Sequence, residues 1–407
     1  MANMIVDKFT YQDTILKQLF KIKEKDYCGQ LIWKIEYNWK KIWKIDEFSK
    51  MESCEQNPKW HGEGNCKKHT ILVCESAEKI INNYLSIDEP KGWIKTEEKF
   101  DYCLILLTAA LFHDIGKIRT TKIGKDGNWH SYNHEYEGEK ITRRLLWDTG
   151  YEFREAVCAL VKYHMIPMNL FDRKDYMEEI TRICHAVPSW NLLMRLKACD
   201  LEGSIQKDEE LKIADYEKII ELEDLGKAIE KHIVPQMKKR KHLYQSHLDS
   251  INKKHLDLIV MIGLPGSGKD TFVNSHYNSD KYAIICRDDI RAELGFCEKG
   301  DKIVGTSKQE DAVTKYFNDK MLEAAKEGKT IVINNTNLKK EYRVGYTRLL
   351  SNYNVHVEYI YIEASTISKN IERRKGQKMG VELFESMIEK FEWPTKDEYD
   401  KLTIAKN

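Results

Sequence analysis

The sequence has no hydrophobic run long enough to cross a membrane and no excess of charge of either sign. Its longest apolar stretch, Leu104–Phe112, is far shorter than the roughly 20 residues that a membrane-spanning helix needs. The residues after Met1 lack the apolar core of a secretory signal peptide. A formal net charge of +1 gives no global nucleic-acid signature, so any such contact must come from local basic groups. We therefore expect a soluble, cytoplasmic protein with no membrane partner.

Paired cysteines, internal repeats and low-complexity tracts are also missing. None of the ten cysteines forms a C-x-x-C pair, which favours free thiols in a reducing compartment. A length of 407 residues is more typical of two domains than of one.

The two halves of the chain have different patterns. Residues 1–250 show helical periodicity, so we predict an all-α domain with an extra helical segment at 1–60 and a charged helical linker at 205–250. A nucleic-acid surface is the alternative for the Lys and Trp residues of 1–60. Residues 251–407 alternate strands and helices, which predicts an α/β domain with a parallel sheet covered by helices. The predicted strands are 256–262, 282–286, 330–334 and 355–362.

The first predicted strand leads into a glycine-rich turn, Gly263-Leu-Pro-Gly-Ser-Gly-Lys269-Asp-Thr271, followed by a predicted helix. This order is that of a phosphate-binding loop, in which backbone N–H groups approach the phosphates and Lys269 reaches the β and γ oxygens. Asp270 stands where Ser or Thr usually binds Mg²⁺, and its carboxylate is also a hard oxygen ligand. We expect ATP, with Mg²⁺, to be held by Gly263, Gly266, Ser267, Gly268, Lys269, Asp270 and Thr271.

Polar motifs follow the other predicted strands, at the edge of the sheet where ligands bind. Arg287-Asp288-Asp289-Ile290-Arg291 suits phosphoryl transfer, since an Asp can accept a hydroxyl proton and an Arg can neutralise the transferred group. Asn334-Asn-Thr-Asn337 can hold an acceptor phosphate, and the basic stretch 370–378 has the composition of a lid. Solvated ion pairs, a turn or helix cap, and a basic surface are the respective alternatives.

Residues 256–394 resemble the polynucleotide 5′-kinase domain of phage and bacterial end-healing enzymes. The resemblance implies that Asp288 is the general base for a 5′-hydroxyl, that Arg291 contacts the transferred phosphate, and that Arg374 or Arg373 is the lid arginine. The chain departs from the family in having Asn335 in place of Asp. The G-K-D-T variant also occurs in nucleoside monophosphate kinases, which keeps a small nucleotide open as substrate. The residues implied to contact the substrate are Arg287, Thr336, Asn337 and Arg373.

A set of histidines and aspartates in the first half predicts a metal site. The apolar run Leu104–Phe112 ends in His113-Asp114, which can both be offered to a metal, and Lys117 lies one turn further on. Imidazole and carboxylate ligands suit Mn, Ni, Co or Zn. His130 is a candidate for an extra contact, whereas we interpret His61 as structural. The candidate ligands are His69, His113, Asp114, His134, His164 and Asp200.

Their order resembles that of the HD phosphohydrolase superfamily, which is all-helical. The resemblance implies metals that lower the pKa of bound water and clamp a phosphate. Because His134 and His164 are both present, two ions are favoured over one. Lys117 would steady the same phosphate.

An HD domain followed by a kinase domain resembles the HD–kinase enzymes that heal nucleic-acid ends. That resemblance implies hydrolysis of 2′,3′-cyclic or terminal 2′/3′ phosphates by the first module and ATP-dependent 5′-phosphorylation by the second. RNA ends are favoured over DNA ends, and a separate ligase would seal the products. The alternative is a nucleotide-metabolism enzyme that joins an HD nucleotidase to a nucleoside or nucleotide kinase.

Overall fold

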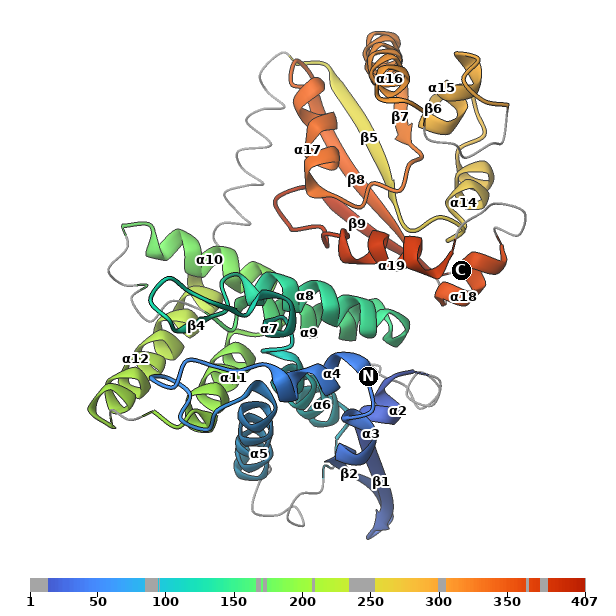
Figure 1. The fold of residues 1–407 in the computed structure, drawn as a ribbon. Coiled ribbons are helices and arrows are strands. Elements are labelled where there is room, and N and C mark those ends of the chain that lie inside the picture. The colour runs from blue at the N-terminus through green and yellow to red at the C-terminus, as the bar shows by residue number, and fades with distance from the viewer. Residues whose placement is uncertain are drawn as a thin grey trace. The chain divides into compact units, whose positions relative to one another are not determined.

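The computed structural model divides the chain into two compact units, Met1–Met237 and Lys238–Asn407, each of which we describe by itself. The structure describes residues 14–84, 94, 96–165, 170, 174–206, 209–233, 253–298, 305–363, 366–373 and 380–406. Figure 1 labels the elements of both units.

The first unit is mainly helical, as the periodicity predicted. Its longer helices surround α6 (Glu97–Phe112), which contacts α5, α9 and α11 (Figure 1). The other helices are α2 (Leu16–Leu19), α3 (Trp39–Ile42), α4 (Asp46–Lys50), α5 (Cys66–Tyr84), α7 (Lys117–Thr120), α8 (His134–Leu145), α9 (Tyr151–Tyr163), α10 (Tyr176–Ala186), α11 (Trp190–Gly203) and α12 (Glu209–Ala228). A π-helical turn, Ile229–Ile233, continues α12. The rest of the predicted linker lies outside the described residues.

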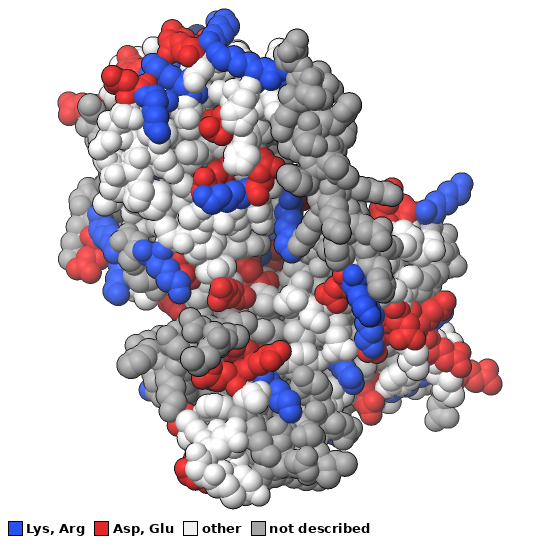
Figure 2. Space-filling view, turned by 180° about the vertical axis from the view of Figure 1, so that it is seen from behind, with Lys and Arg blue, Asp and Glu red and all other residues white. Residues whose placement is uncertain are grey.

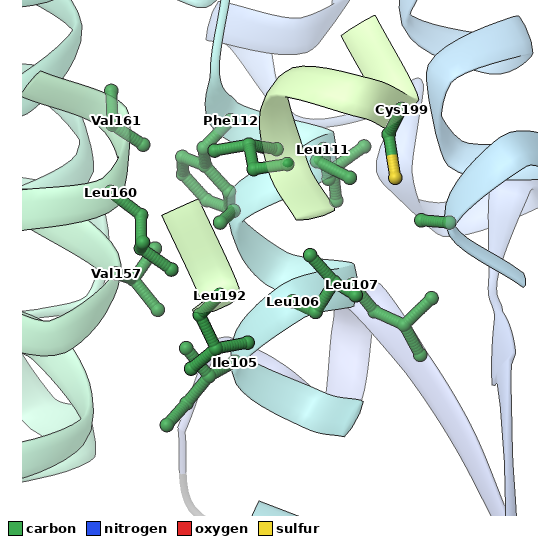
Figure 3. Packing of buried hydrophobic residues seen from close by; sticks show 14 of the residues in the cluster. Ile105, Leu106, Leu107, Leu111, Phe112, Val157, Leu160, Val161, Leu192 and Cys199 are labelled. Carbon is green, nitrogen blue, oxygen red and sulfur yellow. The ribbon is translucent and has the colours of Figure 1, made fainter. Parts of the chain in front are cut away.

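From Cys103 to Phe112, helix α6 is buried around its whole circumference, which agrees with the nearly unbroken apolar sequence of this part. The Thr96 hydroxyl caps its start by accepting from the Lys99 backbone N–H. Its buried side chains form one cluster with Val157 and Leu160 of α9 and with Leu192 of α11 (Figure 3). This packing fixes the end of α6, and therefore the His113-Asp114 pair that follows it, in the middle of the unit.

The prediction of an all-helical segment at 1–60 is wrong for residues 20–37. They form an antiparallel hairpin of β1 (Phe20–Tyr27) and β2 (Gln30–Tyr37). In β2, Trp33, Ile35 and Tyr37 are buried at every second position, which is the period of a strand, and Ile32 is buried as well. The two-residue turn between the strands, Cys28-Gly29, has positive φ at both positions (55° and 78°), as such hairpins require. A second small hairpin pairs β3 (Lys122–Ile123) with β4 (Trp129–His130).

The second unit contains a five-stranded parallel sheet in the order β6-β7-β5-β8-β9. The four predicted strands are confirmed as β5 (His255–Ile262), β6 (Tyr282–Ile285), β7 (Thr330–Ile333) and β8 (Asn354–Glu363). The half-buried edge strand β9 (Lys401–Lys406) was not predicted. Because β6, β7 and β5 are neighbours, the motifs that follow them meet at one edge of the sheet. The helices are α14 (Lys269–His276), α15 (Arg287–Glu293), α16 (Ser307–Glu327), α17 (Lys340–Leu349), α18 (Ile367–Glu372) and α19 (Val381–Glu389).

The surface of the described residues carries charges of both signs. On the face drawn in Figure 2, basic and acidic side chains are interspersed, as expected from a net charge near zero. Neither sign of charge therefore dominates this face of the molecule. Within the described ranges, no helix combines the length and the apolar composition that a membrane crossing requires.

Candidate metal centre and candidate phosphate-binding site

The six predicted metal ligands of the first unit come together at one place. His69 lies on α5, His113 and Asp114 follow α6, His134 begins α8, His164 follows α9, and Asp200 lies on α11. Five of the six are buried, and Asp200 is half-buried. Five helices or helix ends are therefore needed to assemble this centre.

Asp114 lies between two groups of ligands. Its Oδ2 is 3.6 Å from His69 Nε2 and 3.4 Å from His113 Nε2. Its Oδ1 is 3.2 Å from His134 Nε2 and 3.7 Å from His164 Nε2. Asp200 Oδ1 completes the first group at 3.1 Å from His69 Nε2. One carboxylate thus faces two sets of ring nitrogens, which is the arrangement needed to bridge two cations.

The Nδ1 atom of each of the four histidines lies close to an oxygen atom of the protein. His113, His134 and His164 each donate from Nδ1 to a backbone carbonyl, of Ala110, Ser131 and Val161, at 2.6–2.8 Å. His69 Nδ1 lies 2.8 Å from the carboxylate of Glu63. These contacts direct the Nε2 atoms toward Asp114, as in histidines that ligate metals. The donor set therefore fits two divalent transition metals.

Three of the ligands, Asp114, Asp200 and His164, are held in the protonation state that a metal requires, whereas His69 is not. Burial opposes ionisation of Asp114 and Asp200, but Lys117 and His69 respectively outweigh it, so the pKa of each carboxyl lies well below its usual range. Burial lowers the pKa of His164 to about 4, which keeps this ring neutral. Although burial opposes protonation of His69, Asp200 and Glu63 raise its pKa to about 9. Protons and a cation would therefore compete for His69.

A cleft of about 480 Å³ opens over this centre. Asp114, His134 and Asp200 lie on its wall beside three aromatic residues, Trp60, Trp129 and Tyr132. The volume is that of a small-molecule or nucleotide pocket. His130 lines the same cleft, and so does His61, for which the sequence alone favours a structural role.

Lys117 is held beside Asp114 at the wall of the cleft. Its Nζ is 2.6 Å from Asp114 Oδ2 and donates to Gln56 Oε1 at 2.6 Å. Lys117 and Gln56 both line the cleft. A cation held in this way can contact a phosphate oxygen next to the centre.

The predicted phosphate-binding loop of the second unit has the expected geometry. Gly266 and Gly268 have φ of 73° and 102°, and Gly268 caps α14, which begins at Lys269. A Cβ on Gly266 would lie 2.6 Å from the Asn370 carbonyl oxygen. Lys269 Nζ donates to the carbonyls of Gly263 and Leu264 at 3.0 and 2.9 Å. The loop therefore presents its lysine and the start of α14 at the carboxyl end of β5.

The motif after β6 forms an ion-pair network. Arg291 Nη1 is 2.6 Å from Asp288 Oδ1, and its Nε and Nη2 donate to the two carboxylate oxygens of Glu310 at 2.7 and 2.9 Å. Arg287 also donates to Glu310, at 2.9 Å. Glu310, on α16, thus fixes both arginines in place.

The motif after β6 and the phosphate loop both line a cavity of about 160 Å³. In the loop after β7, Asn335 Oδ1 accepts from the Arg287 backbone N–H, and Asn334 Nδ2 donates to Asp270 Oδ1 at 2.9 Å. Thr336 lines the cavity, but Asn337 does not. The lining residues are Lys269, Asp270, Arg287, Asp288, Arg291, Asn334, Asn335 and Thr336.

Asn337 is buried and has bonds within the protein instead. Its side chain donates to the Met261 carbonyl at 2.7 Å and accepts from the Tyr346 hydroxyl at 2.7 Å. This placement joins the loop after β7 to the end of β5. The predicted substrate contact of Asn337 stays a prediction.

The two lid candidates differ in what the structure says of them. Arg373 follows α18 and donates from Nη1 to the Gly266 carbonyl at 3.3 Å, so it reaches the phosphate loop. Arg374 lies outside the described residues.

Several residues around the two sites were not predicted. Gln56 and Glu63 hold Lys117 and His69, Glu310 holds the two arginines, and aromatic residues line the cleft. Gln56 contacts Lys117 across 61 residues of chain and Glu310 contacts Arg291 across 19, so local sequence patterns do not indicate these contacts.

Comparison with known proteins assigns a domain type to each unit. Residues 68–216 match the model of the HD domain, and residues 258–394 match that of an AAA domain. The chain therefore joins a helical HD domain to an α/β P-loop domain, which confirms the predicted fold class and the predicted pairing of modules.

The relatives match only parts of their own length. A protein of Autographa californica nuclear polyhedrosis virus, provisionally named a bifunctional polynucleotide kinase/RNA ligase, is 28% identical over 33% of this chain and 20% of its own length. A multifunctional CCA protein of Actinobacillus pleuropneumoniae is 26% identical over 39% of this chain and 34% of its own length. Among solved structures, a chain of the Pnkp1/Rnl/Hen1 RNA repair complex has a TM-score of 0.31 at 19% identity, over 37% of this chain and 48% of that chain.

Proposed function

We propose that this protein heals nucleic-acid ends, with RNA as the favoured substrate. The HD module hydrolyses a 2′,3′-cyclic or terminal 2′/3′ phosphate, and the P-loop module transfers the γ-phosphate of ATP to a 5′-hydroxyl end. The observation that carries the proposal is a carboxylate-bridged histidine centre below a nucleotide-sized cleft, on the same chain as a phosphate loop that faces an Asp–Arg pair. A separate ligase would seal the ends produced.

In the HD module, the six ligands would hold two divalent metals that supply a water of lowered pKa. Lys117 binds the substrate phosphate through a non-bridging oxygen, and Asp114 keeps the Lys117 Nζ in place. The aromatic residues of the cleft accept the terminal base on their ring faces. Hydrolysis breaks one P–O bond of the cyclic ester, leaves a hydroxyl group on phosphorus and returns a proton to the released ribose oxygen.

In the P-loop module, Lys269 and the backbone N–H groups at the start of α14 hold the phosphates of ATP. Asp270, whose carboxylate is fixed by its amide partner Asn334, would hold Mg²⁺, which would neutralise charge on the phosphates. Asp288 takes the proton of the attacking 5′-hydroxyl. Arg291, oriented by Glu310, neutralises the transferred group, and Arg373 or Arg374 closes over the phosphate loop.

A nucleic-acid end is favoured over a free nucleotide because the chain carries two phosphate chemistries that an end-healing reaction needs together. The name of the viral relative, which pairs a polynucleotide kinase with an RNA ligase, supports the same choice. In the alternative, a nucleotide-metabolism enzyme, mononucleotides would be the better substrates at both sites.

One experiment tests the proposal at both ends of the same molecule. The protein is incubated with ATP and an oligoribonucleotide that bears a 5′-hydroxyl and a 2′,3′-cyclic phosphate, and both ends are analysed by mass spectrometry. We expect loss of the cyclic phosphate and gain of a 5′-phosphate. Parallel assays use an oligodeoxyribonucleotide and mononucleotides. Equal or greater efficiency with mononucleotides would favour the metabolic alternative.

Exposed aromatic residues of the cleft are expected to bind the substrate base. Trp60 and Tyr132 are 40% and 74% exposed, so truncating them should leave the fold intact. Replacing each with alanine should raise KM for a nucleoside 2′,3′-cyclic phosphate by about tenfold, because base–aromatic stacking contributes roughly 1–3 kcal/mol. Hydrolysis of glycerol 1,2-cyclic phosphate, which has no base, should be unchanged.

Tyr27, an exposed tyrosine at the far end of β1, provides the matched control. Its replacement with alanine should affect neither substrate. If the cleft variants lose activity equally on both substrates, the aromatic residues do not act through the base.

A further inference from the structure

A groove in the first unit, separate from the metal centre, concentrates positive charge. The groove has a volume of about 580 Å³, and none of the described residues in its lining is acidic. All five of its lysines are exposed. We call it the lysine groove, lined by Lys17, Phe20, Lys21, Ile22, Asn38, Lys40, Lys41 and Lys44.

The lysines of the groove differ from their neighbours in having no carboxylate beside them. Lys23 and Lys34 pair with Glu36, and Lys50 pairs with Asp46. For the five groove lysines, the described part of the chain holds no ion pair within 4 Å. The charge of this groove is therefore uncompensated by the described residues and attracts an anion with several charges.

The fold holds the two sides of the groove together. The Asn38 backbone N–H donates to the Leu19 carbonyl at 2.8 Å, which joins the start of α3 to the end of α2. Phe20 and Ile42, one on each side, are buried in the core. The Tyr37 hydroxyl donates to the Leu107 carbonyl at 2.8 Å and so ties the hairpin to α6. The lysines therefore project from a platform fixed to the helix that leads into the metal ligands His113 and Asp114.

We propose that the lysine groove binds the sugar-phosphate backbone of a single-stranded polynucleotide. The choice of a nucleic-acid strand rests on the proposed function, whereas the preference for a polyanion rests on the charge alone. Lysine ammonium groups spaced along a groove can follow successive phosphates without reading the bases. The surface is concave, and its apolar residues Phe20 and Ile22 are not exposed, which does not suit insertion into a lipid surface. The groove thus gives the N-terminal segment a role in substrate affinity.

The test measures binding of a fluorescein-labelled oligouridylate to the full chain by fluorescence anisotropy. Replacing Lys40, Lys41 and Lys44 with alanine should raise Kd on the order of tenfold at low salt. The slope of log K against log salt should fall by about 2, because each phosphate contact on a single strand contributes about 0.7. A second variant, Lys17→Ala with Lys21→Ala, acts on the opposite side of the groove and should shift Kd in the same direction.

The matched control replaces with alanine three exposed lysines elsewhere in the chain, Lys79, Lys308 and Lys315. In this variant Kd should stay within about twofold of the parent value and the salt slope within about 0.5, roughly the effect of non-specific charge loss. An unchanged Kd and slope in both groove variants would overturn the proposal. Binding to phosphatidylserine vesicles is measured for the same variants. If the groove variants keep oligouridylate binding but lose vesicle binding, the proposal is also overturned.

Hydrolysis of a nucleoside 2′,3′-cyclic phosphate separates this proposal from the proposed function. The groove and the cleft share no described lining residue, so the groove variants should hydrolyse that substrate normally. If the parent protein hydrolyses no such ester yet binds oligouridylate through the groove, the end-healing proposal fails and the groove stands. Normal hydrolysis together with binding that does not depend on the groove would support end healing and overturn the groove proposal.

Discussion

Replacing Asp114 with asparagine is expected to empty the metal centre and to lower phosphoesterase activity by about a thousandfold or more. Asp114 is the residue whose two carboxylate oxygens face His69 and His113 on one side and His134 and His164 on the other. An amide keeps the shape but loses the negative charge that offsets two cations. The measurements are metal content by inductively coupled plasma mass spectrometry and hydrolysis of a 2′,3′-cyclic phosphate.

The asparagine variant also leaves the buried Lys117 without its charged partner, so a second variant separates metal loss from unfolding. His69→Gln removes a ligand and leaves the Lys117–Asp114 pair intact, and it should also lose metal. His130→Gln changes a histidine of the cleft that is bonded to Asp126 and should keep the metal. ATP-dependent 5′-phosphorylation should persist in all three. Full transition-metal content in Asp114→Asn would contradict a bridging role.

The clustering of the six candidate metal ligands could be predicted from the sequence because their chemistry is carried by the residue types themselves. Histidine and aspartate next to an apolar helix have few structural reasons to be buried, and the order of the set restricts the choice further. The residues that orient them could not be predicted in this way. Glu63 and Gln56 look like ordinary surface residues until the fold brings them to His69 and Lys117. Their function depends on a tertiary contact and not on a local pattern.

The strands of the second unit could be predicted because β5, β7 and β8 are buried on both faces and therefore form apolar runs. Strand β9 lies at the edge of the sheet, is only half-buried and has a lysine at each end, so its sequence lacks that signal. The β1–β2 hairpin was missed for a related reason. Lysines between its apolar residues match an amphipathic helix nearly as well as a strand, and the Cys28-Gly29 turn was the discriminating feature.

Replacing Asp288 with asparagine is expected to lower the kinase turnover number by about 10²–10⁴, the usual contribution of a general base. Asp288 lines the cavity beside Lys269, and its Oδ1 is paired with Arg291, so an amide of the same size removes the base without enlarging the site. Phosphorylation of a 5′-hydroxyl oligoribonucleotide at saturating ATP provides the measurement. The adjacent Asp289 is exposed and does not line the cavity, so Asp289→Asn is the matched control and should retain near-normal turnover. Normal turnover in Asp288→Asn would refute the assignment of the base.

Lys269→Ala is expected to abolish kinase activity by a different route, and the contrast between the two variants tests the division of roles. Lys269 is proposed as the loop cation for the β and γ phosphates, so its loss should weaken ATP binding as well as turnover, on the order of a hundredfold or more. Asp288→Asn should bind ATP normally.

The kinase activity of Asp270→Asn should be restored by raised Mg²⁺ if Asp270 holds the ion, and an unchanged Mg²⁺ titration would show that it does not. Phosphoesterase activity should survive in all of these variants, because the metal centre and the phosphate loop belong to separate units of the chain. Joint loss of both activities in Lys269→Ala would mean that the two modules cannot be treated as independent catalysts.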